Sequence, residues 1–139
     1  CIRDSIKGIR KGQFLFYEED GTLRVLRDIN SFTSFAAAKN SDFSSNRVVR
    51  VLDSITNDVA NIFSKYYLGK QSNNANGRNL LKAEILAYHE ELMKLEAIEG
   101  FTADDITVEK GTEKQDVVVY EAIQPVDAME KLYMKVEVV

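Results

Sequence analysis

The sequence predicts an α+β fold in which two long amphipathic helices pack against a mainly antiparallel β-sheet, with an N-terminal β-hairpin and a C-terminal edge strand. Two observations predict it: apolar residues recur every three or four positions through residues 48–98, and apolar and polar residues alternate after residue 105. The length of 139 residues and the hydrophobic content of 45% suit one compact core, so we expect residues 1–139 to form a single domain.

The N-terminal part predicts a short helical end followed by a hairpin. Residues 2–11 place isoleucines at helical spacing among basic residues. Two apolar runs, residues 14–17 and 23–26, flank Asp20-Gly21, a pair that supplies the positive-φ residues of a tight hairpin turn. Residues 30–46 are rich in Asn, Ser, Thr and Ala and are expected to form a loop.

Two amphipathic helices are predicted in the middle of the chain. The first should end near Gly69, and its apolar face carries Val48, Leu52, Ile55, Val59, Ile62 and Tyr66. The second should be capped by Gly100, and its apolar face carries Leu81, Ile85, Tyr88, Leu92, Leu95 and Ile98. Residues 71–77 between them are rich in Asn and Ser, whose side chains compete for backbone hydrogen bonds, and should form the interhelical loop.

Strands are predicted in the last third of the chain. Residues 106–108 and 117–120 should form two of them, with a turn at Lys110-Gly111. Pro125 interrupts the pattern. The clearest alternation of the whole sequence then follows, because Leu132, Met134, Val136 and Val138 are separated by Tyr133, Lys135 and Glu137.

Composition argues against several classes of function. The formal charge of −4 gives no general electrostatic attraction to nucleic acid or an anionic membrane, although a local basic patch could still dock another protein. No apolar run approaches the ~18 residues that span a bilayer. The single cysteine, Cys1, allows no intramolecular disulfide, which fits a reducing compartment.

No catalytic, cofactor or metal site is predicted. One Cys and one His cannot supply the converging ligands of a zinc site. We expect His89 to be a surface histidine paired with a nearby acid, since Glu90 and Glu91 follow it; a small enzyme that uses His89 with a carboxylate is the rival interpretation. The segment from Gly8 to Gly12 lacks the spacing of a phosphate-binding loop.

Four strings, in order along the chain, resemble the contractile phage tail sheath family. They are residues 46–53 (NRVVRVLD), residues 67–70 (YLGK), Gly77-Arg78, and residues 124–133 (QPVDAMEKLY), which form the most specific block. Residues 23–30 also resemble the family's entry into its C-terminal domain, so the resemblance covers essentially the whole chain. The motif positions singled out are Arg47, Arg50, Asp53, Gly69, Gly77, Arg78, Gln124, Pro125, Asp127 and Glu130.

The resemblance implies a structural, non-enzymatic subunit of a contractile tail, from a phage, a prophage or an R-type bacteriocin-like particle. Such a subunit self-assembles around the tail tube by strand exchange and contracts to drive the tube through the target envelope. The implied partners are neighbouring sheath subunits and the tail tube protein, with no nucleic acid, membrane, small-molecule substrate or cofactor. The implied location is the virion tail or a tail-like particle, assembled in the bacterial host cytoplasm.

The resemblance also implies that the chain is the C-terminal core domain of a longer sheath protein, without its N-terminal arm and outer domains. The alternating C-terminal segment is then the candidate inter-subunit strand, because exposed strand edges recruit further strands. Its residues are Lys131, Leu132, Tyr133, Met134, Lys135, Val136, Glu137, Val138 and Val139.

Two alternatives to this interpretation stay open. The C-terminal strand could complete the sheet of its own domain instead of joining a neighbour. The chain could also be a non-polymerising adaptor or tube-binding module of a tail-like apparatus, with the same fold.

Overall fold

The computed structural model describes residues 2–138 of the chain. These residues divide into two compact units, one formed by residues 2–49 with 127–138, and the other by residues 50–126. Two such units can still fold as one cooperative domain, so the expectation of a single domain stays a prediction. Among the described residues, no helix has the length and apolar character that a membrane span requires.

The first unit opens with helix α1 (Ile2–Arg10) and the hairpin of β1 (Phe16–Glu19) and β2 (Thr22–Val25). The strands pair antiparallel, with Phe16 opposite Val25 and Glu19 opposite Thr22. Asp20 and Gly21 both have positive φ, 51° and 75°, which is the backbone of a tight hairpin turn. The predicted hairpin and its turn residues are confirmed.

A short 3₁₀ helix (Ser41–Ser44) leads into helix α2 (Asn46–Ile62). The start of α2 is held by the preceding loop, because the Asn46 side chain donates a hydrogen bond of 2.8 Å to Asp28 and the Ser45 hydroxyl accepts one from the backbone N–H of Val48. Ile29 forms an antiparallel bridge with Ser45. Long-range contacts therefore order a loop whose composition predicts no regular structure.

In the second unit, α2 continues into a π-helical turn (Phe63–Tyr67), so the helical segment ends just before Gly69, as predicted. Helix α3 (Ala75–Lys94) follows after a loop. Asn74 caps it, since its side-chain oxygen accepts a 2.8 Å hydrogen bond from the backbone N–H of Gly77.

Two tyrosine–carboxylate hydrogen bonds join the helical segments of this unit. The Tyr67 hydroxyl donates to Glu84 at 2.8 Å, and the Tyr88 hydroxyl donates to Asp58 at 2.7 Å. Burial and the hydrogen bond to Glu84 raise the pKa of Tyr67 to about 12, and burial and the hydrogen bond to Asp58 raise the pKa of Tyr88 as well. Both tyrosines therefore remain protonated donors at neutral pH.

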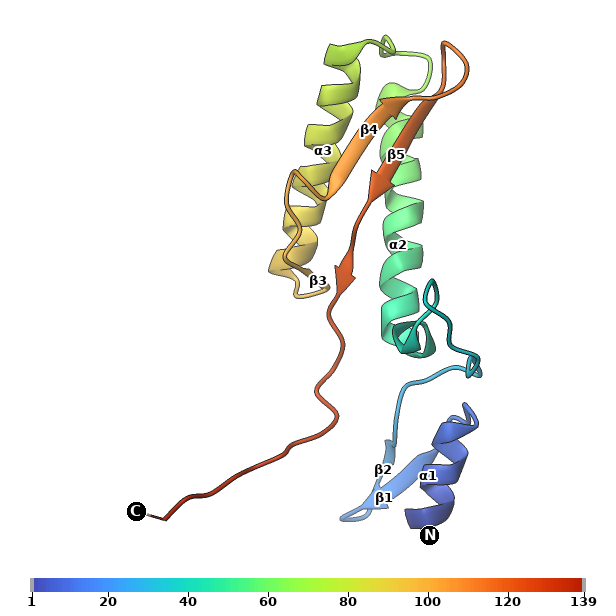
Figure 1. The fold of residues 1–139 in the computed structure, drawn as a ribbon, viewed down its shortest axis with the longest axis vertical. Helices are drawn as coiled ribbons and strands as arrows, with labels where there is room; N and C mark the ends of the chain where they lie inside the picture. Colours follow the sequence, from blue (N-terminus) through green and yellow to red (C-terminus); the bar gives the residue numbers. More distant parts are fainter. Residues whose placement is uncertain (1, 139) are drawn as a thin grey trace. The chain divides into compact units, whose positions relative to one another are not determined.

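The strands of the second unit form two small antiparallel ladders, β4 (Ile106–Lys110) with β5 (Val117–Glu121) and β3 (Ile98–Glu99) with β6 (Gln124–Pro125). β6 extends the line of β5, as Figure 1 shows. The backbone N–H of Ala122 donates to Asp105 and that of Val126 donates to Ala97, so β4 and β3 lie along the same edge of the β5–β6 segment.

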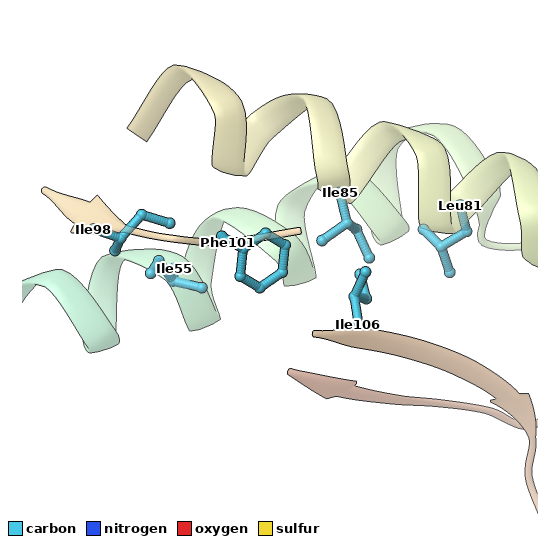
Figure 2. Close-up of a cluster of buried hydrophobic side chains, with 6 residues drawn as sticks. All are labelled: Ile55, Leu81, Ile85, Ile98, Phe101 and Ile106. Carbon is cyan, nitrogen blue, oxygen red and sulfur yellow. The ribbon is translucent and has the colours of Figure 1, made fainter. Parts of the chain in front are cut away.

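The core lies between these ladders and the two long helices. Figure 2 shows Leu81 and Ile85 of α3 directed toward Ile106 of β4. Ile85 is fully buried, and Ile106 is 1% exposed. The buried cluster consists of Ile55, Leu81, Ile85, Ile98, Phe101 and Ile106. The α+β fold with two long helices and antiparallel strands is confirmed.

The predicted end of the second helix is wrong. α3 stops at Lys94, and Glu96, with a φ of 55°, is the left-handed residue that closes it; Gly100 also has a positive φ, 66°, but lies beyond β3. The backbone N–H of Ala97 bonds to Leu92 and that of Glu96 bonds to Met93, which is Schellman-type closure. This early end frees Ile98, expected on the helix stripe, to pair with Pro125 and bury all but 2% of its surface.

The predicted C-terminal edge strand does not form within the single chain. Residues 126–138 have no regular secondary structure, and Val139 lies outside the described residues. A strand is defined by hydrogen bonds to a neighbouring strand. The alternating pattern of residues 131–138 is therefore present without a partner strand.

Candidate assembly interface

One edge of β5 carries unpaired backbone groups. The even-numbered neighbours of this strand bond toward β4. The backbone N–H of Ala122 donates to the carbonyl of Asp105, and the carbonyl of Asp116 accepts from the N–H of Gly111, both at 2.9 Å. Because backbone groups alternate along an antiparallel strand, those of the odd-numbered residues point to the opposite edge. No strand within residues 2–138 pairs with that edge. The unpaired row of backbone groups consists of Val117, Val119 and Glu121 of β5. Ile123 follows the strand and lines the same side.

An apolar groove of about 450 Å³ runs beside this edge, between β5 and helix α2. The side chains of the same odd-numbered residues form one of its walls. Its other lining residues come from the helices: Leu52, Ile55, Thr56, Val59, Ala60, Phe63, Leu81 and Ile85. A free strand edge next to an apolar groove is the arrangement that accepts an added strand, because it offers backbone hydrogen bonds and burial together.

A buried ion pair borders the groove. His89, on α3, is fully buried, and its Nε2 lies 3.4 Å from Oε2 of Glu121 on β5. Its Nδ1 lies 2.8 Å from the carbonyl oxygen of Ile85, and its ring stacks on Phe101 with centroids 4.1 Å apart. Burial alone lowers the pKa of His89, but Glu121 and the Ile85 carbonyl outweigh it, so the net shift is upward.

The expectation of a surface His89 paired with Glu90 or Glu91 is therefore wrong. Those two residues follow His89 on α3. The acid that contacts the ring is Glu121 of β5, 32 residues later in the sequence. The side chain of Glu121 is 12% exposed, and its Oε1 has no hydrogen-bond partner among residues 2–138. Sequence reasoning missed Glu121, and the only signal was an acid directly after the apolar run of the strand predicted at residues 117–120.

The candidate inter-subunit strand is exposed in the first unit. Its apolar residues have almost no cover: Leu132 is 86% exposed, Met134 77%, Val136 74% and Val138 93%. Glu130, just before it, forms an ion pair of 2.7 Å with Arg27. Nothing within the described residues buries the alternating face, although that face has the composition of a buried strand.

The motif residues at turns and strand ends have structural contacts. Arg78 donates hydrogen bonds of 3.3 and 3.0 Å to the backbone and side-chain oxygens of Asn73, whose own amide donates to the backbone oxygens of Lys114 and Asp116. This network ties the start of α3 to the β4–β5 turn. A Cβ added to Gly77 would lie 2.1 Å from the backbone oxygen of Ser72, so only glycine fits there.

The remaining motif residues are spread over both units. Gln124 donates to Glu99 across the β3–β6 ladder at 2.7 Å, next to Pro125, which pairs with Ile98. The carboxylate of Asp127 accepts a hydrogen bond from the N–H of Ala128. Helix α2 carries Arg47, Arg50 and Asp53, and Gly69 follows the π-helical turn. These residues therefore do not converge on one site.

Comparison with known proteins identifies the family of the chain. Residues 38–139 match the family of the phage tail sheath C-terminal domain. The chain is 34% identical to the Phage-like element PBSX protein XkdK of Bacillus subtilis and 32% identical to the tail sheath protein of Clostridium phage phiCD119. Those matches cover 96% and 77% of this chain but only 30% and 29% of the relatives, so the chain spans about a third of their length.

Solved structures give the same result. The crystal structure of a sheath tail protein from Desulfitobacterium hafniense is 42% identical and superposes with a TM-score of 0.83 over 98% of this chain and 32% of that one. A sheath tail protein from Listeria innocua is 30% identical, with a TM-score of 0.82 over 96% of this chain and 32% of that one. The chain belongs to the phage tail sheath C-terminal domain family.

Proposed function

We propose that this chain is the C-terminal domain of a longer sheath protein and links neighbouring subunits by strand exchange. In this proposal, residues 131–139 of one copy add as a strand to the free edge of β5 in a neighbouring copy. One observation supports this proposal. The chain has an unpaired strand edge beside an apolar groove, and it also has an exposed apolar segment that packs on nothing among residues 2–138.

The two surfaces match in chemistry. A strand laid along β5 would form backbone hydrogen bonds with Val117, Val119 and Glu121, which need no particular partner sequence. Its alternating face would place Leu132, Met134, Val136 and Val138 toward the groove. Each such side chain, once fully buried, contributes ~1.5–3 kcal/mol.

We assign the occupant to a neighbouring copy, because residues 131–138 pair with no strand among the described residues of their own chain and the sheath family supports assembly with further subunits. Residues 127–138 group with residues 2–49, and the Arg27–Glu130 ion pair attaches the start of the segment there. A joint made of backbone hydrogen bonds at the end of an extended segment tolerates large rigid-body shifts of the subunits it connects. We infer that such joints keep the sheath connected while it contracts around the tail tube in a virion or tail-like particle.

Self-association of the chain tests the strand exchange. Sedimentation equilibrium should show concentration-dependent association. Val136→Lys, in the donated segment, and Ala60→Arg, on the exposed helical side of the groove, should each reduce it at least about tenfold, since a charge would replace apolar burial. Leu23→Lys is the matched control, because Leu23 is also an exposed apolar residue, on β2, and should leave association unchanged.

Two results would contradict the proposal. One is a chain that stays monomeric at all concentrations. The other is equal loss of association in the Leu23→Lys control, which would indicate nonspecific apolar contact. For the whole protein, electron microscopy of the full-length parent protein should show tubes or contracted rings. Single unassembled subunits in the presence of the tube protein would indicate a non-polymerising adaptor.

A further inference from the structure

The His89–Glu121 pair borders the groove that the added strand would fill. We propose that strand docking on β5 is coupled to one proton held between His89 and Glu121, so that docking is favoured at acidic pH and weakens as the pH rises. This inference rests on the proposed function, because it concerns the regulation of the same groove.

The geometry of the imidazole requires that proton. Nδ1 of His89 faces the carbonyl oxygen of Ile85 at 2.8 Å, and a carbonyl can only accept, so Nδ1 carries a hydrogen. In a neutral ring, Nε2 would then be a bare acceptor facing the Glu121 carboxylate, also an acceptor, at 3.4 Å. A proton on Nε2 or on the carboxyl group converts this repulsion into attraction.

An added strand raises the cost of losing that proton. The Glu121 side chain is 12% exposed and lines the groove, while its backbone belongs to the free edge. A strand placed along that edge and filling the groove would exclude the remaining water from the carboxylate. With the shared proton the covered pair is neutral overall, and without it a net negative charge would be sealed in an apolar site.

Among residues 2–138, the His89 ring contacts a backbone carbonyl, two neutral aromatic side chains and the Glu121 carboxylate. Phe101, which stacks on the imidazole, is uncharged, and the turn that follows it carries Asp105, whose carboxylate accepts hydrogen bonds from Thr102. Tyr88 packs edge-on against the ring and donates its hydroxyl to Asp58 of α2. None of these side chains carries a positive charge that would take the place of the shared proton.

The test is sedimentation equilibrium of the full chain between about pH 6 and pH 9, a range that starts below the ordinary histidine pKa of about 6.5. His89 is the only histidine in the sequence. The association constant should fall as the pH rises, approaching about tenfold per pH unit above the pKa of the free pair. Glu121→Gln should associate independently of pH, because a neutral amide can donate directly to an unprotonated Nε2.

The control is Glu109→Gln on β4, an exposed acid on the adjacent strand, which should keep the pH dependence of the unmodified chain. Association that is equally strong at every pH, or a pH dependence that survives in Glu121→Gln, would overturn the coupling while leaving strand exchange intact. Absence of association at every pH would overturn the strand exchange and the coupling with it.

Discussion

Strand β4 and the C-terminal segment have the same alternating pattern, but the apolar side chains of β4 are buried or partly buried and those of the segment are exposed. Ile106 in β4 is 1% exposed, because β5 pairs with its backbone and α3 covers its side chain. Leu132, in an equally regular alternation, is 86% exposed. Periodicity therefore specifies which face of a segment is apolar, whereas a partner strand determines whether that face is buried.

The largest expected difference between the two regions is in folding stability. Ile85→Ala should lower the free energy of unfolding by about 2–5 kcal/mol, because it leaves a cavity at a fully buried position. Leu132→Ala should change it by less than about 0.5 kcal/mol, since this exposed side chain has little cover to lose. Urea unfolding at a concentration low enough to keep the chain monomeric measures both; equal losses would contradict the contrast.

A smaller loss is expected at the start of α3. Gly77→Ala should destabilise by about 1–3 kcal/mol, because the new Cβ meets a backbone oxygen that cannot rotate away. Asn79→Ala, at an exposed position of the same turn, should be neutral or slightly stabilising, since alanine favours helix. Thermal unfolding of the two variants separates steric fit from helix propensity, and a stabilised Gly77→Ala would show that the loop at Ser72 yields easily.

Protonation of His89 should make the stability of the second unit depend on pH. The folded pKa of His89 is raised above its ordinary value of 6.5, so its contribution to stability is fully present below pH 6.5 and disappears as the pH rises through the folded pKa. The melting temperature of the monomeric chain should therefore fall over this window. Glu121→Gln should reduce that pH dependence, and an unchanged slope would mean that another group titrates.

The smallest effect is expected where the segment joins its own unit. Glu130→Ala removes the partner of Arg27 in a partly exposed ion pair, with side-chain exposures of 39% for Arg27 and 33% for Glu130. Such pairs contribute about 0–1 kcal/mol. Urea unfolding should barely change, whereas faster amide exchange in residues 128–131 would show that the pair restrains the segment. A loss above about 2 kcal/mol would mean that the segment is part of the folded core.

Local patterns predicted most of the fold for identifiable reasons. Asp20-Gly21 predicted the hairpin because few residues adopt positive φ at both turn positions, and the spacing from Val48 to Tyr66 predicted α2 because one face must remain apolar. The end of α3 was not predictable from Gly100. Glu96 adopts a left-handed conformation there since burial of Ile98 in the β3–β6 ladder favours an earlier stop.

The candidate interface divides in the same way. The sequence alone determined the donor half, because the alternation of residues 131–138 and the motif residues 124–133 are local properties of the chain. Only the tertiary structure decided the acceptor half: which edge of β5 is unpaired, where the groove lies, and that Glu121 meets His89. Those features depend on contacts between residues far apart along the chain, and spacing within a segment carries no information about which distant segment will cover it.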